Sequence, residues 1–359
     1  MLAWLKRFAR ATAVWAYALT MLLFAAGYAA RYVPPGGLWG LQLVAIGLPV
    51  LAGLVVLLTI PVAMSRRLPL MVLQVVAVGL IVGRFGAASQ VEASSDAEEH
   101  LTVMTFNLPY GMEGDRQPRL GRVLEVVRSE RPHVLGFQET MMTYHPDGTP
   151  ASGRRVVKTI VDSLGYATAG PVSRGPAQTE APLVTSLDLG PVRFIDLPGG
   201  VNAQAVRAEC RVGDETIVLY NIHLQSYGTR KPWREAGSRV LDPGLWLDYF
   251  RQYRRAIRLR SLQAKILAEQ IATETKPLIV LGDFNATQHN HEYGLLADGL
   301  TDTYDVAGNT WGGTYHARLP VARIDFILVS SAFDVVEARV LNARLSDHLS
   351  VVATLRRVR

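Results

Sequence analysis

Side chains that can bind metal ions or move protons follow one apolar segment after another in the last two-thirds of the chain. Each segment is short and rich in β-branched residues, which predicts a β-strand. Their ends carry carboxylate, amide or imidazole groups: Asn107, Glu139, His223, Asp283, Asn285, Asp325, Asp347 and His348. A single Asp or His in such a place is commonly a turn residue or a structural imidazole. The repetition indicates one shared site, because strand ends present rigid side chains to a common cleft.

These residue types suit the hydrolysis of a phosphate ester. That reaction needs charge neutralisation at phosphate, an activated water molecule and help for the leaving oxygen. Carboxylate and amide oxygens can hold Mg²⁺ or Mn²⁺, and no cluster of His or Cys is needed, which disfavours zinc. The single cysteine, Cys210, lies in an alternating stretch and is expected to be a buried, inert thiol.

Strands and helices alternate from Leu101 onward, which predicts an α/β domain. Apolar segments suggest strands at 101–106, 133–137, 217–222, 277–281, 323–329 and 350–355. Helical spacing of apolar residues appears at 120–127 and 258–271.

The order and spacing of these motifs resemble the endonuclease/exonuclease/phosphatase superfamily. That superfamily includes DNase I-like nucleases, abasic-site endonucleases, inositol polyphosphate 5-phosphatases and neutral sphingomyelinases. The resemblance covers residues 101–359 and implies a four-layer α/β sandwich, in which two packed mixed sheets are flanked by helices. It rests on six motifs: Asn107, Gln138-Glu139, His223-Leu224, Gly-Asp-Phe-Asn at 282–285, Arg-Ile-Asp-Phe-Ile at 323–327, and Ser346-Asp347-His348.

The resemblance and the ligand preferences of Mg²⁺ together suggest a metal site. Glu139 is the expected principal ligand. Asn107 is expected to orient that carboxylate or a metal-bound water, and Asp347 to be a second metal or water ligand. The extra acidic ligand that some nucleases carry is absent, because Leu108 and Pro109 follow Asn107.

The remaining motif residues are expected to act on the phosphate. Asp283 would activate the attacking water, and Asn285 would present its amide to a phosphate oxygen. The family pattern pairs Asp325 with His348, which would contact the phosphate and stabilise the transition state. His223 resembles the second family histidine, a phosphate contact or general acid. The intact set argues against a catalytically inactive binding domain.

Nearly all of the first 90 residues are apolar, unlike the rest of the chain. A helix needs about 20 apolar residues to cross a bilayer. The runs 11–30 and 38–64 reach that length, and the run from 68 reaches it only by including Arg84, which can snorkel to the headgroups. We therefore expect a block of three transmembrane helices at 1–89, a polar linker at 90–100 and a catalytic domain at 101–359.

Basic residues around these runs predict the orientation. Lys6, Arg7 and Arg10 precede the first run, and two further arginines at 66–67 lie between the second and third, whereas Arg31 alone follows the first. The positive-inside rule places the N-terminus in the cytoplasm. Three spans then place the catalytic domain outside the cytoplasm, in a multi-pass cell-membrane protein.

A long segment after His223, residues 225–255, interleaves arginines with aromatic residues. It suits an amphipathic helix on the domain, a surface that contacts lipid headgroups, or a nucleic-acid groove. The net charge of +6 does not distinguish these partners. A domain tethered to a bilayer meets lipids at high effective concentration. The favoured substrate is therefore a phospholipid or lipid-linked phosphate, with cleavage of DNA or RNA as the alternative.

Overall fold

The computed structural model describes residues 1–86, 100–109, 117–199, 203–227 and 241–358. The chain divides into two compact units. One comprises Met1–Ala87 together with His289–Gly294, and the other comprises Ala88–Gln288 and Leu295–Arg359. Of the expected linker at 90–100, all but His100 lies outside the described residues.

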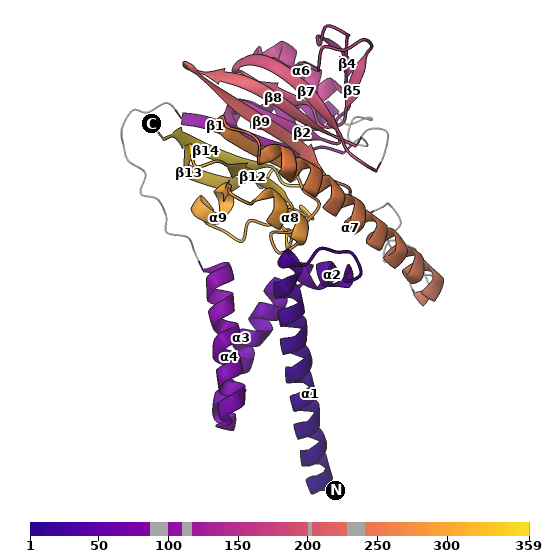
Figure 1. The fold of residues 1–359 in the computed structure, drawn as a ribbon, viewed down its shortest axis with the longest axis vertical. Helices are drawn as coiled ribbons and strands as arrows, with labels where there is room; N and C mark the ends of the chain where they lie inside the picture. Colours follow the sequence, from indigo (N-terminus) through magenta and orange to yellow (C-terminus); the bar gives the residue numbers. More distant parts are fainter. Residues whose placement is uncertain (87–99, 110–116, 200–202, 228–240, 359) are drawn as a thin grey trace. The chain divides into compact units, whose positions relative to one another are not determined.

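The first unit consists mainly of apolar helices (Figure 1). They are α1 (Leu2–Ala29), η1 (Ala30–Tyr32), α2 (Gly40–Ile46), α3 (Leu48–Ser65) and α4 (Leu68–Phe85). Three described segments are long and apolar enough to cross a membrane: Arg10–Tyr32, Leu48–Ser65 and Leu68–Phe85. The prediction of three candidate spans is confirmed by length and composition.

The boundary predicted for the second span is wrong. The run 38–64 is broken at Gly47, where α2 ends and α3 begins. Pro49 has no N–H for the carbonyl one turn earlier, so it suits the first turn of a new helix and not the interior of a continuous one. The candidate span is therefore α3 alone.

One buried amide donates hydrogen bonds from α4 to α3. Gln74 of α4 is 2% exposed and donates from Nε2 to the Val55 carbonyl of α3 at 2.6 Å. The same nitrogen lies 3.0 Å from the Thr59 hydroxyl. Hydrogen bonds of this kind join helices in an apolar solvent, where an unpaired amide is costly.

The segment 289–294 contacts the helices of its own unit. Asn290 donates from Nδ2 to the carbonyl and to Oε1 of Gln42, at 2.9 and 3.0 Å. The backbone N–H of His291 donates to the same Oε1 at 3.1 Å. The Arg31 guanidinium lies 4.8 Å from the centre of the Tyr293 ring, a cation–π distance. A short piece of the C-terminal sequence thus belongs structurally with the helices.

The second unit contains two large mixed sheets and one small sheet. The five-stranded sheet has the order β13 (Phe333–Val340), β14 (Val351–Arg357), β1 (His100–Asn107), β2 (Val134–Gln138) and β6 (Leu183–Thr185). The six-stranded sheet has the order β11 (Thr301–Asp302), β12 (Asp325–Val329), β10 (Leu278–Asp283), β9 (Glu215–His223), β8 (Gln204–Val212) and β7 (Asp188–Asp196). The small sheet has the order β4 (Pro150–Gly153), β3 (Met142–Tyr144) and β5 (Ala177–Thr179).

The two large sheets pack face to face around one apolar core. Val103 and Val134 of the first sheet share this core with Leu219, Ile279 and Leu281 of the second. Because side chains alternate along a strand, every second side chain of each sheet faces away from this core and forms its outward set. The outward set of the five-stranded sheet packs against α5 (Gln117–Glu130) and α6 (Arg155–Leu164).

The helix α7 (Pro243–Ile271) lies along the other large sheet and completes the predicted four-layer sandwich. Arg193 of β7 donates to Gln270 of α7 at 3.1 Å. Two short helices, α8 (His291–Leu296) and α9 (Thr303–Ala307), follow in the C-terminal part. The predicted fold class is confirmed.

The start predicted for α7, residue 258, is wrong by about four turns, because the helix begins at Pro243. Asp242 caps the helix by accepting a 2.8 Å hydrogen bond from the Gly244 N–H, and Pro243 suits the first turn. The described part of the basic segment is therefore helical, with Tyr253 buried and Arg251 exposed. Its residues 228–240 lie outside the described part of the chain.

Candidate active site

Strand register brings three of the motif residues into one row. Asp283, the last residue of β10, pairs with His223 of the parallel strand β9 and with Asp325 of the antiparallel strand β12. In the opposing sheet, Asn107 at the end of β1 pairs with Gln138 at the end of β2. The two sheets thus present their polar strand ends at the same place.

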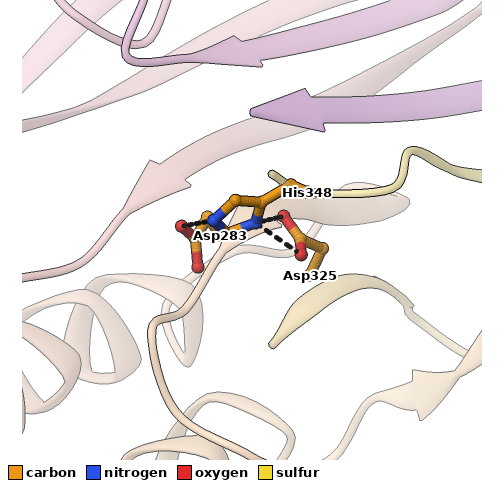
Figure 2. Close-up of side chains that lie close together, drawn as sticks. All are labelled: Asp283, Asp325 and His348. Carbon is orange, nitrogen blue, oxygen red and sulfur yellow. Dashed lines mark hydrogen bonds and ion pairs between the residues drawn. The ribbon is translucent and has the colours of Figure 1, made fainter. Parts of the chain in front are cut away.

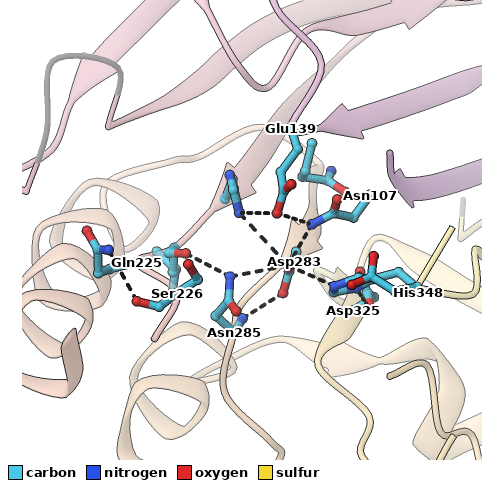
Figure 3. A network of polar contacts seen from close by, with 12 residues as sticks. Asn107, Glu139, Gln225, Ser226, Asp283, Asn285, Asp325 and His348 are labelled. Carbon is cyan, nitrogen blue, oxygen red and sulfur yellow. Dashed lines mark hydrogen bonds and ion pairs between the residues drawn. The ribbon is translucent and has the colours of Figure 1, made fainter. Parts of the chain in front are cut away.

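Asp283 is the centre of the site (Figure 3). Its side chain is 1% exposed, and its Oδ2 accepts from Asn107 Nδ2 at 2.9 Å and from Asn285 Nδ2 at 3.2 Å. Its Oδ1 accepts from the Asn285 backbone N–H at 2.7 Å. Burial raises the pKa of Asp283, so the protein holds a basic carboxylate at this point. These amides fix its orientation.

His348 and Asp325 form a buried pair beside Asp283 (Figure 2). His348 Nδ1 lies 3.0 Å from Asp325 Oδ2, and His348 Nε2 lies 3.8 Å from Asp283 Oδ2. Burial disfavours the charged imidazole, but the carboxylates of Asp325 and Asp283 outweigh it and raise the pKa of His348 to about 10. The predicted pairing of Asp325 with His348 is present, and it favours the positively charged form of the His348 imidazole.

His223 differs from His348, because its pKa is lowered and not raised. Its Nε2 lies 3.9 Å from Glu139 Oε1 and 4.0 Å from Asp283 Oδ2. Desolvation lowers the pKa of this imidazole despite the nearby carboxylates. The site therefore combines one charged and one neutral histidine on two sides of Asp283.

Oxygen donors suited to a hard divalent cation meet at the ends of β1 and β2. Asn107 Nδ2 lies 3.4 Å from Glu139 Oε1, and Asn107 Oδ1 is buried without a hydrogen-bond partner among the described residues. Burial and the Asp283 carboxylate raise the pKa of Glu139, and Asp347 adds to this effect. A cation bound by Glu139 and Asn107 would satisfy the amide oxygen and offset this repulsion, so the residues fit Mg²⁺ or Mn²⁺.

A second grouping has the composition of a metal site. Within the described chain, ligand atoms of Asp283, Asp325 and His348 lie within 4.8 Å of one another. However, His348 Nδ1 is hydrogen-bonded to Asp325, and an imidazole that carries both protons cannot coordinate a cation. The Glu139 and Asn107 side of the site therefore stays the predicted place of the cation.

Two of the site residues have left-handed backbone conformations. Glu139 has φ +56° and Asn285 has φ +49°, which are unfavourable for residues with a Cβ. Gly282, with φ +141°, precedes Asp283, and a Cβ at this glycine would lie 1.9 Å from the Ile222 carbonyl oxygen. Only glycine allows β10 to approach β9 this closely beside the Asp283 carboxylate.

Sequence reasoning missed Asn221, a buried amide of β9 that links the two sheets. Its Nδ2 donates to the carbonyls of Phe137 and Ala181 at 2.9 Å each and of Pro182 at 3.0 Å, and its Oδ1 accepts from Gln138 Nε2 at 2.7 Å. Gln138, quoted above as a motif residue, is thus a support beneath Glu139. The available signal was an amide inside an otherwise apolar strand, since a buried amide must find partners.

The structure brings the predicted site residues together. One polar network contains Asn107, Glu139, His223, Asp283, Asn285, Asp325 and His348. Asp347 lies next to it, with its Oδ1 3.4 Å from the Ser346 hydroxyl. The stretch 173–186, for which no strand was predicted, contains the short strands β5 and β6. The role of each residue stays a prediction.

Comparison with known proteins agrees with this geometry. The sequence pattern of the Endonuclease/Exonuclease/phosphatase family matches residues 104–348. Among curated proteins, none matches the chain.

Solved structures share the fold at low sequence identity. A humanized D. rerio TDP2 with 14 mutations is 16% identical with a TM-score of 0.51, and covers 72% of this chain and 99% of its own. The human Nocturnin catalytic domain with bound sulfate anion is 20% identical with a TM-score of 0.50, and the match covers 73% of this chain and 96% of that domain. A family protein from Bacteroides thetaiotaomicron is 17% identical with a TM-score of 0.50, and covers 74% and 100%. The chain belongs to the endonuclease/exonuclease/phosphatase family and is a metal-dependent phosphoester hydrolase.

Proposed function

We propose that this protein hydrolyses a phosphate ester of a membrane lipid, with its catalytic unit on the extracytoplasmic face. The observation that carries the proposal is the presence, in one chain, of a family hydrolase site and of three segments able to cross a membrane. A site attached to a bilayer meets lipid phosphates at high effective concentration.

The proposed chemistry assigns the attacking water to Asp283. Its carboxylate is held by Asn107 and Asn285 and is made more basic by burial, so it can take a proton from a water aimed at phosphorus. As the water oxygen bonds to phosphorus, the bond to the ester oxygen breaks; the proton of the attacking water passes to Asp283, and the leaving oxygen takes a proton from solvent water. When bound at Glu139 and Asn107, Mg²⁺ would neutralise phosphate charge.

The two histidines divide the remaining tasks. His348, kept charged by Asp325, places a cation beside the phosphate, where negative charge grows in the transition state. His223, on the other side of Asp283, can hydrogen-bond the ester oxygen. Asn285 fits a contact to a phosphate oxygen but also holds Asp283 and the Leu224 carbonyl.

The test is a substrate comparison with the full chain in detergent or liposomes. Phospholipids of several headgroups, plasmid DNA and RNA are each incubated with Mg²⁺, Mn²⁺ or EDTA. We expect metal-dependent release of headgroup or phosphate from lipid, abolished by EDTA. Cleavage of nucleic acid with intact lipids would replace the proposal by the nuclease alternative.

A further inference from the structure

The loop 312–322, between α9 and β12, folds back on itself beside the candidate active site. The backbone N–H groups of Thr314 and Tyr315 donate to the Ala322 carbonyl at 2.8 and 2.9 Å. In return, the Ala322 N–H donates to the Tyr315 carbonyl at 3.1 Å, so these two residues form an antiparallel bridge. The base of the loop therefore has a defined backbone conformation.

Two further backbone hydrogen bonds join this loop to the chain on either side of His348. The Ala317 N–H donates to the Asp347 carbonyl at 2.8 Å. The Leu349 N–H donates to the Thr314 carbonyl, also at 2.8 Å. The loop thus holds both the residue before His348 and the residue after it.

The same loop holds the backbone of Asp325, the hydrogen-bond partner of His348. Thr314 is fully buried, and its Oγ1 accepts from the N–H groups of Ile324 and Asp325 at 3.1 and 3.3 Å. Thr314 therefore contacts the Asp325 backbone through its hydroxyl and the chain after His348 through its carbonyl.

The ring of Tyr315 packs against the imidazole of His348. Their centres are 4.9 Å apart and their planes are tilted by 50°, within the ~4.5–7 Å range of aromatic pairs. The torsion that turns a histidine ring has a broad energy minimum, so one hydrogen bond at Nδ1 leaves the ring free to rock. A second contact on the ring limits this rocking and keeps Nε2 directed at Asp283 Oδ2, 3.8 Å away.

We propose that Tyr315 is a positioning residue, which holds the His348 imidazole in the orientation that the hydrolysis needs. Thr314 supports it by fixing the backbone of Asp325 and of the chain after His348. This inference rests on the phosphate contact proposed above for His348, and it holds for any phosphate ester that the site hydrolyses. A misplaced group weakens contacts made in the transition state, so the effect belongs in kcat and not in KM.

The first experiment replaces the Tyr315 ring. The full chain in detergent micelles is assayed with Mg²⁺ on bis(4-nitrophenyl) phosphate, a soluble diester, and on the preferred lipid. Tyr315→Leu should lower kcat by about 10- to 100-fold and change KM by less than about 3-fold. Tyr315→Phe keeps the ring and should stay within about 3-fold of wild type.

Leu319→Ala, at a 71% exposed position of the same loop, is the matched control and should match wild type. A wild-type kcat in Tyr315→Leu, an equal loss in Tyr315→Phe, or a loss confined to KM would overturn the assignment.

The second experiment tests the hydroxyl of Thr314 with a matched pair of variants. Valine has the shape of threonine without its oxygen, whereas serine keeps the oxygen that accepts from Ile324 and Asp325. Thr314→Val should lower kcat by about 3- to 10-fold, and Thr314→Ser should stay within about 2-fold of wild type. Equal kcat values in the two folded variants would remove Thr314 from the proposal.

A measurement without turnover separates this inference from the lipid hydrolase proposal. Histidine-selective ¹⁵N labelling and NMR of the full chain report the Nδ1 proton between His348 and Asp325, assigned by its loss in His348→Gln. This proton should exchange with water faster in Tyr315→Leu than in wild type or Tyr315→Phe. Equal exchange in all three would refute the positioning role even if lipid is hydrolysed. Faster exchange in Tyr315→Leu without lipid hydrolysis by wild type would keep that role and remove the proposed function.

Discussion

His223 and His348 lie within reach of the same carboxylate yet differ in charge. His348 is stabilised as a cation by Asp325, whereas desolvation keeps His223 neutral. The pairing of one cationic and one neutral imidazole around Asp283 suits a reaction in which charge grows on the phosphate while the leaving oxygen needs a hydrogen bond. The two imidazoles differ in pKa because their surroundings differ.

Asp283→Asn should abolish turnover without unfolding the protein. The substitution keeps the shape and an acceptor for the Asn285 N–H but removes the base, whose contribution is typically about 10²–10⁴-fold. Initial rates on the best lipid and a thermal melt test this. Asp162→Asn, an exposed carboxylate on α6, is the control. Near-normal rates would remove Asp283 as the water activator.

Glu139→Ala should reduce both activity and metal affinity. Loss of a metal ligand should lower the affinity for Mg²⁺ by more than ~10–100-fold, which is the loss typical when a residue that only supports a ligand is replaced. Mg²⁺ titrations of rate and calorimetry measure this, with the exposed Glu125→Ala on α5 as the control. A variant with the wild-type metal profile would move the ion elsewhere.

At the scale of elements, strand ends were predictable because a buried strand is an apolar run that stops where polar residues begin. The strands ending at Asn107, Gln138 and Asp283 therefore appeared in the sequence. The break at Gly47 and the early start of α7 were missed, since both depend on a proline and a cap within otherwise continuous patterns. The pairing of Asp283 with His223 could be expected only through the family resemblance, because register is a non-local property.

Asn221→Ala should destabilise the sandwich. It leaves three carbonyls and Gln138 without their shared partner between the two sheets. The expected loss is on the order of 3 kcal/mol, the cost of unpaired buried groups. Thermal and urea unfolding in detergent provide the measurement, and Asn342→Ala at an exposed position is the control. Equal melting of the two variants would refute the bridging role.

The contact between the turn after α7 and β8 should be pH-dependent. Arg207 donates to both oxygens of Glu274 and, with Tyr220, lowers the pKa of that carboxyl. A lowered pKa gives stability that is complete above the unfolded value, about 4.3, and is lost as pH falls through the folded value. Melting from pH 7 to pH 3 should show this loss in wild type and a smaller one in Glu274→Gln. An equal fall in melting temperature with pH in wild type and in Glu274→Gln would exclude a link between the Glu274 pKa and stability.

At the scale of the molecule, the proposed orientation depends on one lysine and a few arginines near the candidate spans. Cys210 is buried and its thiol pKa is raised to about 12 by burial, so the native chain has an inert thiol. A cysteine introduced elsewhere can therefore report topology without background.

Leu319→Cys, at a position 71% exposed in the catalytic unit, should react with a membrane-impermeant maleimide added to intact cells. Ser65→Cys, at the last residue of the second candidate span, should react only after permeabilisation. The opposite pattern would place the catalytic unit in the cytoplasm.

The contacts of residues 289–294 with Gln42 and Arg31 have a consequence for how this protein can vary. A loop that begins four residues after Asn285 shares hydrogen bonds with α2 of the helical unit, so residues 1–87 are not an interchangeable module. Replacing residues 1–87 by an unrelated anchor would remove partners from a segment in which Asn290 and Tyr293 are 1% and 2% exposed. We therefore expect position 42 to change in step with position 290 as such proteins diverge, and chimaeras to require both regions from the same parent.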